Sequence, residues 1–254
     1  MVLSMDRWRG KIAVVTGASS GIGAGIARRL VEEGLLVVGI ARRSDLIDKM
    51  ALELSDKKGK LYSYKADISK GEEVKLAFQW IIENLGPVQV LVNNAGIHYR
   101  QTLLDGDPEN WKKTLDVNVL ALCIATQEAT KMMRKIDAEG HVFHINSIGG
   151  HSVANLPNMD IYSATKFAVT ALTETLRREL QQIKSKIRIT SISPGAVDTP
   201  IFDEKTRNSQ AFNDLIGKHM LQPEDIADAI VYVLSTPPHV QVHELTIKPL
   251  NEVL

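Results

Sequence analysis

The segment Ile12-Ala-Val-Val-Thr16-Gly17-Ala18-Ser19-Ser20-Gly21-Ile22-Gly23 lies near the start of the chain. A short β-branched run leads into closely spaced glycines, and a helical pattern follows over residues 21–33. Glycine allows a tight turn and close backbone approach, and a helix N-terminus offers unpaired N–H groups and a positive dipole end. These features suit a dinucleotide pyrophosphate. The alternative is a turn that merely joins a strand to a helix, and the GxxxGxG spacing differs from the commoner GxGxxG.

The rest of the chain continues this alternation of short apolar runs and longer helical patterns. We predict strands at residues 12–16, 36–40, 61–64, 88–92, 141–146, 187–191 and 242–247. We predict helices at residues 21–33, 46–55, 71–84, 109–135, 161–184 and 223–234. Alternation of this kind indicates βαβ units, and nearly unbroken apolar strands indicate a parallel sheet buried on both faces. The predicted fold class is therefore α/β: a single-domain, doubly wound Rossmann fold with seven parallel strands, covering residues 1–254.

Two long connections, at residues 148–160 and 195–221, interrupt this regular pattern. Both follow predicted strands, on the side where open α/β sheets bind ligands, and long connections in compact domains are often functional. Pockets are mostly apolar, so their apolar side chains suggest an isoprenoid, a steroid or a similar alcohol or ketone as substrate. The alternative is that half of them simply pack the loops. The apolar residues of these two connections are Val153, Leu156, Met159, Ile201, Phe202, Phe212, Leu215, Ile216 and Met220.

The end of the second predicted strand indicates which dinucleotide binds. An acidic residue about 20 positions after the glycines usually binds the ribose hydroxyls of NAD. The chain instead has Arg42 and Arg43 there, and Asp45 lies slightly beyond. Guanidinium groups can bind a 2′-phosphate through paired hydrogen bonds. The sequence therefore favours NADP(H). The alternative is a solvated loop.

Composition argues against several other classes of protein. The chain has 30 basic and 30 acidic residues, and this zero formal net charge does not favour a nucleic-acid partner. No apolar run of about 18 residues predicts membrane insertion. The single cysteine gives no internal disulfide, and we expect a cytoplasmic protein. The seven histidines show no zinc-like spacing, so we expect no metal.

Tyr162 and Lys166 are four residues apart and would share one face of a helix. A nearby ammonium favours the phenolate and lowers the tyrosine pKa, which makes the pair a plausible general acid and base. Ser147 follows a predicted strand, where its hydroxyl could bind a substrate oxygen. Asn118 lies inside a helical pattern although asparagine is a poor helix former. Alone, each feature also fits an ordinary structural role.

Together, these residues resemble the short-chain dehydrogenase/reductase family over essentially the whole chain. The motifs occur in order: Thr16–Gly23, Asn93-Asn94-Ala95-Gly96, Asn118, Ser147, Tyr162-xxx-Lys166 and Pro194-Gly195. Residues 7–11 and 39–43 further resemble a subgroup that contains insect farnesol dehydrogenases and dehydrogenase/reductase member 11.

The resemblance implies four catalytic residues. Tyr162 would exchange a proton with the substrate oxygen, and Lys166 would lower the tyrosine pKa and bind the nicotinamide ribose. Ser147 would orient the carbonyl, and Asn118 would hold a water in a proton relay. The residues implied to bind the cofactor are Gly17, Ser19, Ser20, Gly21, Ile22, Gly23, Arg42, Arg43, Asp67, Ile68, Asn94, Ala95, Gly96, Tyr162, Lys166, Pro194, Gly195, Val197 and Thr199.

The expected function is that of an NADP(H)-dependent oxidoreductase that interconverts an apolar alcohol, such as farnesol or a steroid, with its aldehyde or ketone. One alternative is a 3-oxoacyl thioester reductase, and another is a catalytically silent nucleotide-binding sensor or scaffold. The resemblance also implies a homodimer or homotetramer that associates through the helices predicted at residues 109–135 and 161–184.

Overall fold

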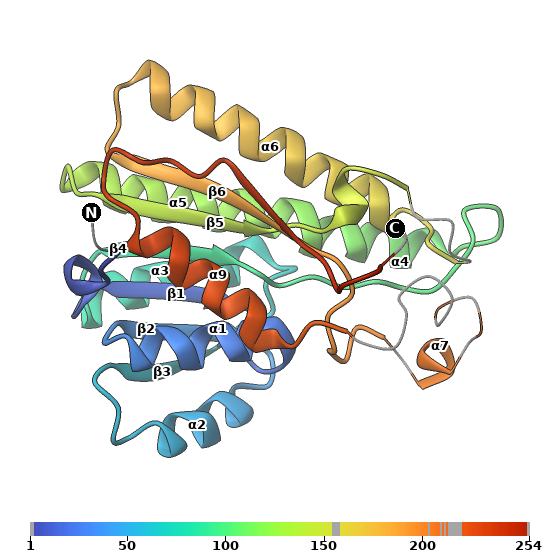
Figure 1. The fold of residues 1–254 in the computed structure, drawn as a ribbon, viewed down its shortest axis with the longest axis horizontal. Coiled ribbons are helices and arrows are strands. Elements are labelled where there is room, and N and C mark those ends of the chain that lie inside the picture. Colours follow the sequence, from blue (N-terminus) through green and yellow to red (C-terminus); the bar gives the residue numbers. More distant parts are fainter. Residues whose placement is uncertain are drawn as a thin grey trace.

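Seven parallel strands form one sheet in the order β3-β2-β1-β4-β5-β6-β7 (Figure 1). The computed structural model describes residues 3–252 except 154–157, 203, 209, 211 and 213–219. The strands are β1 (Ile12–Thr16), β2 (Leu36–Ala41), β3 (Lys60–Lys65), β4 (Val88–Asn93), β5 (Gly140–Ile145), β6 (Ile187–Pro194) and β7 (Glu244–Ile247). From β1 the chain runs outward to β2 and β3 and then returns to β4 on the other side of β1. The predicted doubly wound parallel sheet is confirmed.

Helices cover both faces of this sheet. One apolar cluster joins it to α1 (Gly21–Glu32), α2 (Ser44–Glu53) and α9 (Pro223–Ser235). A second joins it to α3 (Gly71–Asn84), α5 (Ala121–Lys135) and α6 (Tyr162–Gln182). In β1, Ala13 and Val15 belong to the first cluster, whereas Ile12 and Val14 belong to the second, because successive strand side chains point to opposite faces. The central strands are therefore buried on both sides, as their apolar runs predict.

Residues 109–135 are helical, as predicted, but the helix is not regular throughout. Asp107 caps α4 (Pro108–Leu115) by accepting a 2.9 Å hydrogen bond from the Glu109 N–H. A π-helical turn (Asp116–Leu120) then separates α4 from α5. The local sequence includes Asn118, and asparagine competes with regular helix through its own hydrogen bonds. The distortion therefore falls at a predicted site residue.

Other boundaries differ by a few residues. Helix α2 begins at Ser44 rather than at residue 46, and β7 begins at Glu244 rather than at residue 242. The register explains the second difference, because the pairing of β6 with β7 starts at Ser191 and Glu244. Short helices occupy Asp6–Trp8 and Ile148–Gly150, and α7 (Glu204–Arg207) lies within the 195–221 loop.

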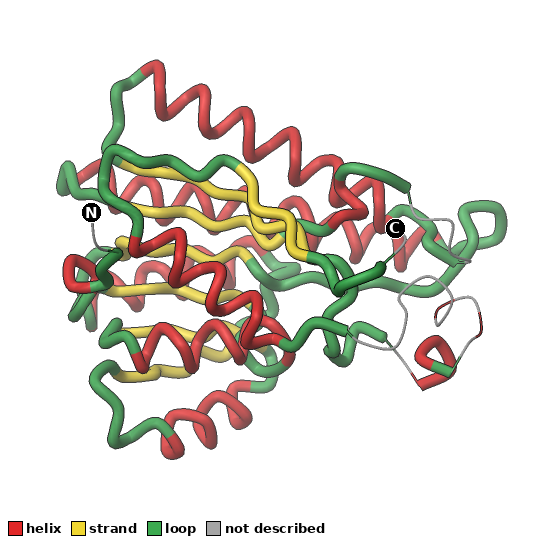
Figure 2. Tube along the Cα trace, in the orientation of Figure 1, coloured by secondary structure: helices red, strands yellow, loops and turns green. Residues whose placement is uncertain are grey.

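The loops at the carboxyl ends of the strands gather at one end of the molecule. Figure 2 shows them beyond the strands, at the end where α7 and the C-terminus also lie. These loops carry the predicted site residues, because the carboxyl ends of parallel strands share one edge of the sheet.

Candidate active site

The glycine turn, residues 16–23, packs directly against the loop that follows β4. Thr16 Oγ1 accepts hydrogen bonds from the backbone N–H groups of Asn94 at 3.0 Å and Ala95 at 3.1 Å. The Asn94 side chain donates in return to the Thr16 carbonyl at 2.9 Å. Gly17 has φ +70°, and a Cβ there would lie 2.9 Å from Ala95 Cα. The contact requires glycine at this position.

Helix α1 begins where the glycine turn ends. Ser20 is its N-cap residue in extended backbone, and within the described part of the chain no side chain caps this turn. A Cβ on Gly23 would lie 2.4 Å from the Gly17 carbonyl oxygen, so the first helical turn approaches the loop closely. Ser19 remains partly exposed, and Ile22 packs against the first apolar cluster. This arrangement fits a dinucleotide pyrophosphate, which needs close backbone approach and N–H donors at a helix N-terminus.

The two arginines after β2 extend this region. Arg43 Nη2 donates to Ser20 Oγ at 3.0 Å, so its guanidinium lies beside the glycine turn. Arg42 lies near Asp67, in the loop after β3. Burial opposes ionisation of Asp67, but hydrogen bonds from Ser69 and the charge of Arg42 help to lower its pKa. The structure thus brings Arg42, Arg43 and Asp67 to the same end of the sheet, and both arginines are exposed.

The remaining predicted cofactor residues lie along the same edge. Ile68 and Ala95 line a narrow hollow that also touches Thr16 and α5. Gly96 is exposed. A Cβ on Gly21 would lie 3.1 Å from Thr199 Cβ, which places the loop after β6 against the start of α1.

Two of the predicted catalytic residues lie at the starts of helical elements at this edge. Ser147 is the N-cap of the Ile148–Gly150 turn and accepts a 3.0 Å hydrogen bond from the Gly149 N–H. Tyr162 is the first residue of α6, and its side chain is hydrogen-bonded to Ser147. The structure therefore joins two residues that are 15 positions apart in the sequence.

Lys166 lies one helical turn after Tyr162, as their spacing predicts. Its Nζ atom donates to the Ile145 carbonyl at 2.9 Å and lies 5.7 Å from the centroid of the Tyr162 ring. Burial raises the pKa of Tyr162 to about 12, and the hydrogen bond with Ser147 acts in the opposite direction. Burial also lowers the pKa of Lys166 to about 8. Burial outweighs the hydrogen bond with Ser147, so the pKa of Tyr162 lies above its usual value and favours the protonated phenol at neutral pH.

Asn118 is buried in the π-helical turn, and its side chain is fully engaged. Its Oδ1 atom accepts from the Ile97 N–H at 2.8 Å, and its Nδ2 atom donates to the Ile97 carbonyl at 3.0 Å. Nδ2 also donates to Thr165 Oγ1 at 3.1 Å. Asn118 therefore joins the β4 loop to α6. If Asn118 holds a water of the proton relay, its main chain would have to bind that water, since Oδ1 and Nδ2 of its side chain already have hydrogen-bond partners.

Two residues of this site were missed by reasoning from the sequence. The His98 ring lies against the Tyr162 ring, with centroids 4.8 Å apart and planes inclined at 34°. Asp160 Oδ1 accepts from the Tyr162 N–H at 2.9 Å. An aspartate just before a helical pattern is a capping signal that could have revealed Asp160. A single histidine in a loop carries no comparable signal.

The loop at residues 195–221 is anchored at its base. The Gly195 N–H donates to the Ile247 carbonyl at 2.7 Å, and the Ala196 N–H donates to Glu252 Oε1 at 2.9 Å. Val197 forms an isolated bridge with Leu221. Pro194 ends β6, so the predicted Pro194-Gly195 pair marks the exit from the sheet.

Arg207 of α7 holds the next part of this loop. Its Nη2 atom donates to the Thr199 carbonyl at 2.8 Å, its Nε atom donates to the Phe202 carbonyl at 3.1 Å, and its Nη1 atom pairs with Asp198.

The residues expected to form an apolar pocket differ from one another in burial. Phe202, Phe212 and Met220 pack together around Ala196, with the two phenylalanine rings 5.0 Å apart. Val153 is 72% exposed, Ile201 and Met159 are half-buried, and Leu156, Leu215 and Ile216 lie outside the described residues.

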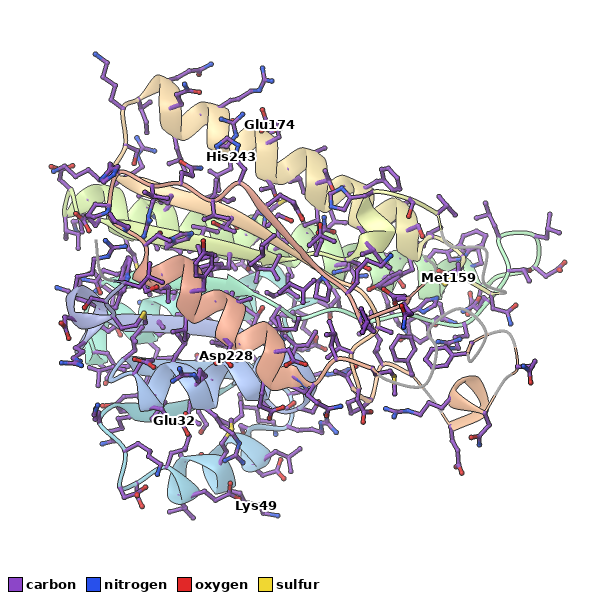
Figure 3. The ribbon with its side chains drawn as sticks, in the orientation of Figure 1. Glu32, Lys49, Met159, Glu174, Asp228 and His243 are labelled. Carbon is purple, nitrogen blue, oxygen red and sulfur yellow. The ribbon has the colours of Figure 1, made fainter. Side chains whose placement is uncertain are left out.

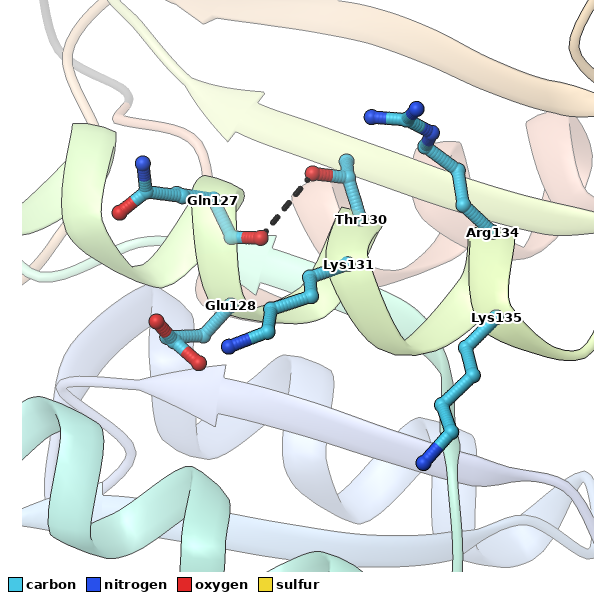
Figure 4. Close-up of a pocket in the computed structure, with 6 residues that line it drawn as sticks. All are labelled: Gln127, Glu128, Thr130, Lys131, Arg134 and Lys135. Atoms are coloured by element: carbon cyan, nitrogen blue, oxygen red, sulfur yellow. Dashed lines mark hydrogen bonds between the residues drawn. The ribbon is translucent and has the colours of Figure 1, made fainter.

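A larger hollow, of about 660 Å³, lies elsewhere, on the outer surface of α5 (Figure 4). It is open, polar and lined by side chains of this one helix, which include Lys131, Arg134 and Lys135. None of the predicted site residues contributes to it.

In the described ranges, no cluster of three or more histidine, cysteine or acidic residues could hold a metal ion. No helix among them has the length and apolar character to cross a membrane.

Comparisons with known proteins agree with this geometry. The pattern of the short chain dehydrogenase family matches residues 11–210. The chain is 47% identical over 250 residues to farnesol dehydrogenase of Aedes aegypti, across 98% of this chain and 99% of that protein. It is 45% identical over 259 residues to dehydrogenase/reductase SDR family member 11 of Bos taurus, across 98% and 100%. An alcohol dehydrogenase of Thermococcus sibiricus, complexed with 5-hydroxy-NADP, has a TM-score of 0.81 at 29% identity and covers 94% of this chain and 97% of that one.

Proposed function

The chain belongs to the short-chain dehydrogenase family of oxidoreductases, and from that premise we propose that it interconverts an apolar alcohol and its aldehyde or ketone with NADP(H). One observation carries the proposal: the half-buried phenol of Tyr162 is hydrogen-bonded to Ser147, and the Lys166 ammonium lies 5.7 Å from its ring. This group of side chains lies at the same edge of the sheet as the glycine turn. An acid, a hydrogen-bonding hydroxyl and a cation in one place suit polarisation and protonation of a carbonyl.

The nicotinamide would supply the hydride that reaches the substrate carbon. The Ser147 hydroxyl would donate a hydrogen bond to the carbonyl oxygen and fix its position. Tyr162 would then deliver its proton to that oxygen as negative charge develops there. In the oxidation direction, Tyr162 would first lose this proton and would then accept the proton of the substrate hydroxyl.

Lys166 would stabilise the tyrosinate that remains after proton transfer. Its ammonium lies 5.7 Å from the phenol ring and is held in place by the Ile145 carbonyl. Attraction between opposite charges is stronger where water is partly excluded, and Lys166 is buried while Tyr162 is half-buried. The proton could be restored from solvent through a water held by the main chain of Asn118 in the π-helical turn, a kind of distortion that is frequent at functional sites.

The preference for NADP(H) over NAD(H) rests on Arg42 and Arg43. Both guanidinium groups are exposed after β2, and Arg43 reaches Ser20 in the glycine turn. A 2′-phosphate on a ribose bound beside this turn would lie between two cations. The related alcohol dehydrogenase of Thermococcus sibiricus was solved with an NADP derivative, which supports the same preference.

The substrate class is inferred from the loop at residues 195–221. Phe202, Phe212 and Met220 give its described part an apolar interior beside the site, which favours an apolar substrate. The relative from Aedes aegypti is named as a farnesol dehydrogenase, so an isoprenoid alcohol is the first substrate to test, with a steroid as the second.

We further propose that the chain acts as one domain and assembles as a homodimer or homotetramer. Leu120, in the π-helical turn that leads into α5, is 51% exposed, and Phe167, on α6, is 42% exposed. Large apolar side chains exposed on these two helices would be covered by a second subunit. Light scattering on the purified protein would give the number of subunits.

The experiment that tests the proposed function compares initial rates of NADP⁺ reduction with farnesol, a hydroxysteroid and a short secondary alcohol. NAD⁺ serves as the cofactor control. We expect the highest kcat/KM with NADP⁺ and an apolar alcohol. Equal rates with all three alcohols would contradict the apolar pocket, and equal rates with both cofactors would contradict the assignment of the arginines.

A further inference from the structure

His98 occupies a position that the proposed reaction does not use. It lies in the loop after β4, and its side chain is only 5% exposed. Its ring faces the Tyr162 ring at 4.8 Å between centroids, whereas Ser147 is hydrogen-bonded to the same tyrosine. The imidazole therefore covers part of the phenol without replacing its hydrogen-bond partner.

His98 also contacts the turn that precedes α6. Asn158 and Asp160 have φ values of 60° and 37°, a left-handed conformation that is uncommon for residues other than glycine and that asparagine and aspartate adopt more readily than most. The Nε2 atom of His98 lies 3.2 Å from the Asn158 carbonyl oxygen, and a second hydrogen bond reaches the Met159 backbone. Such a turn persists only where its surroundings hold it, and His98 provides part of that hold.

The turn at residues 158–160 also fixes the start of α6. Asp160 Oδ1 accepts from the Tyr162 N–H at 2.9 Å, and the Asp160 side chain is fully buried. One unbroken series of contacts thus runs from the β4 loop through His98 and the turn to the backbone of Tyr162. Rotation or displacement of the turn would move the phenol relative to Ser147.

Burial, together with the charge of Arg100, favours the neutral form of the His98 ring. Burial lowers its pKa to about 4, and the charge of Arg100 on the same loop acts in the same direction. The other groups that face the pair are Asp160, at 3.8 Å from Nε2, and Lys166 beyond the phenol. A neutral imidazole has one N–H group, which can donate to the Asn158 carbonyl oxygen near neutral pH. It does not add a second cation next to the tyrosine.

We infer that His98 is a positioning residue for Tyr162: its neutral ring holds the left-handed turn at residues 158–160 and shields one face of the phenol from water. The inference rests on the proposed function, because it assigns the orientation and the protonated state of the general acid to this ring. His98 contacts neither reacting atom in this assignment, so it is not itself a proton donor to substrate.

Three substitutions separate the two parts of this role. His98→Gln retains a side-chain N–H donor for the turn but removes the ring. His98→Phe retains the ring over the phenol but removes the donor. His98→Ala removes both. His243→Ala is the matched control, because His243 is exposed and lies well away from Met159 of the turn in Figure 3.

The measurements are kcat and KM for NADPH-dependent reduction of farnesal across the pH range, together with NADPH binding by fluorescence. We expect His98→Ala to lower kcat about 10- to 100-fold, because small displacements of a catalytic group are costly, while NADPH affinity changes less than about threefold. In the wild type, kcat for reduction should fall at alkaline pH as the phenol loses its proton, and we call this fall the alkaline decline. In His98→Ala the alkaline decline should begin at a lower pH, because water that reaches the phenol lowers the tyrosine pKa. Lys166 titrates in both proteins and does not account for the difference.

The two partial substitutions should behave differently from each other. His98→Gln should recover part of kcat but retain the displaced alkaline decline. His98→Phe should retain the wild-type alkaline decline with a reduced kcat. If all three variants keep the kcat and the alkaline decline of the His243→Ala control, His98 does not position Tyr162. Parallel losses of kcat, NADPH affinity and melting temperature in all three would also overturn the inference, since they indicate a general folding defect.

Tyr162→Phe, measured alongside, distinguishes this inference from the proposed function. If Tyr162→Phe is inactive while the His98 variants match the control, only the role of His98 fails. If the wild type and Tyr162→Phe consume NADPH at the same rate with farnesal, the proposed function fails and the role of His98 fails with it.

Discussion

Lys166 of α6 is hydrogen-bonded to Ile145, the last residue of β5, with 2.9 Å between Nζ and the carbonyl oxygen. Ser147 follows two residues later on the same chain segment. The end of β5 therefore positions both the ammonium below Tyr162 and the hydroxyl that contacts its phenol. This hydrogen bond explains how the charge on Lys166 is held in place although its side chain is buried.

The pH dependence of the reaction should differ between its two directions. Oxidation of an alcohol requires the tyrosinate, and the pKa of Tyr162 is raised to about 12, so the oxidation rate should rise with pH through the neutral and mildly alkaline range. Reduction requires the protonated phenol, which is present throughout this range. Initial rates in both directions, measured from about pH 6 to about pH 10, test this expectation. A rate of oxidation that falls as pH rises would contradict it.

Removal of the two arginines should change cofactor preference. The double variant Arg42→Ala with Arg43→Ala should weaken NADPH binding by about tenfold or more, because a charged hydrogen bond contributes about 1.5–3 kcal/mol. NADH, which lacks the 2′-phosphate, should be affected much less. Lys49→Ala is the control, because Lys49 is an exposed cation on α2, away from the glycine turn (Figure 3). Equal weakening of both cofactors in a fluorescence titration would refute the assignment.

The loop at residues 195–221 should lose substrate affinity when Arg207 is removed. Arg207→Ala breaks hydrogen bonds to the Thr199 and Phe202 carbonyls and the ion pair with Asp198. We expect KM for an apolar alcohol to rise about tenfold, because the loop must be reordered on binding, with a smaller effect on NADPH binding. Glu204→Ala, an exposed change on the same helix, should leave both parameters near the wild-type values. Unchanged KM in Arg207→Ala would show that this anchor does not shape the substrate site.

Acid should destabilise the protein through its buried histidines. Burial lowers the pKa of His144 to about 3 and of His98 to about 4, and it places that of His141 well below the usual value. The unfolded chain therefore binds protons that the folded chain does not as pH falls below about 6.5. Each such histidine lowers the free energy of unfolding by about 1.4 kcal/mol per pH unit between its unfolded and folded pKa values.

Urea unfolding at several pH values would measure this slope. The slope of the unfolding free energy against pH is proportional to the number of protons taken up on unfolding. His144→Gln should lower that number by about one, since one buried group no longer takes up a proton when the chain unfolds. His239→Gln, at an exposed histidine, should leave the slope unchanged. A slope that is the same in both variants would mean that His144 is not buried in its neutral form.

Much of the fold was predictable because its signals are local. The strand–turn–helix at residues 12–33 and the apolar strands predict a parallel sheet. Its strand order was not predicted, because the same alternation of elements is compatible with more than one order. The prediction of family membership is confirmed by the match over residues 11–210 and by the relatives at 47% and 45% identity. The break at Asp116–Leu120 was not predicted, because helical periodicity continues across a single π-helical turn.

The candidate site was predictable only where residues form spaced motifs. Ser147, Tyr162 and Lys166 could be associated because each stands at a strand end or on one helix face. The contact of His98 with Tyr162 depends on how the β4 loop folds over α6, and no periodicity encodes that approach. The raised pKa of Tyr162 likewise depends on burial by the assembled loops, which the pairing with Lys166 did not reveal.

The central claim is that Tyr162 is the general acid and base of a carbonyl reductase. Its most direct test is the rate of NADPH consumption with farnesal as substrate in the wild type and in Tyr162→Phe, with NADPH affinity measured for both. We predict that kcat falls about 10²- to 10⁴-fold while NADPH affinity stays within a few-fold, because the substitution removes only the proton donor. Equal turnover by the two proteins, at equal NADPH affinity, would contradict the claim.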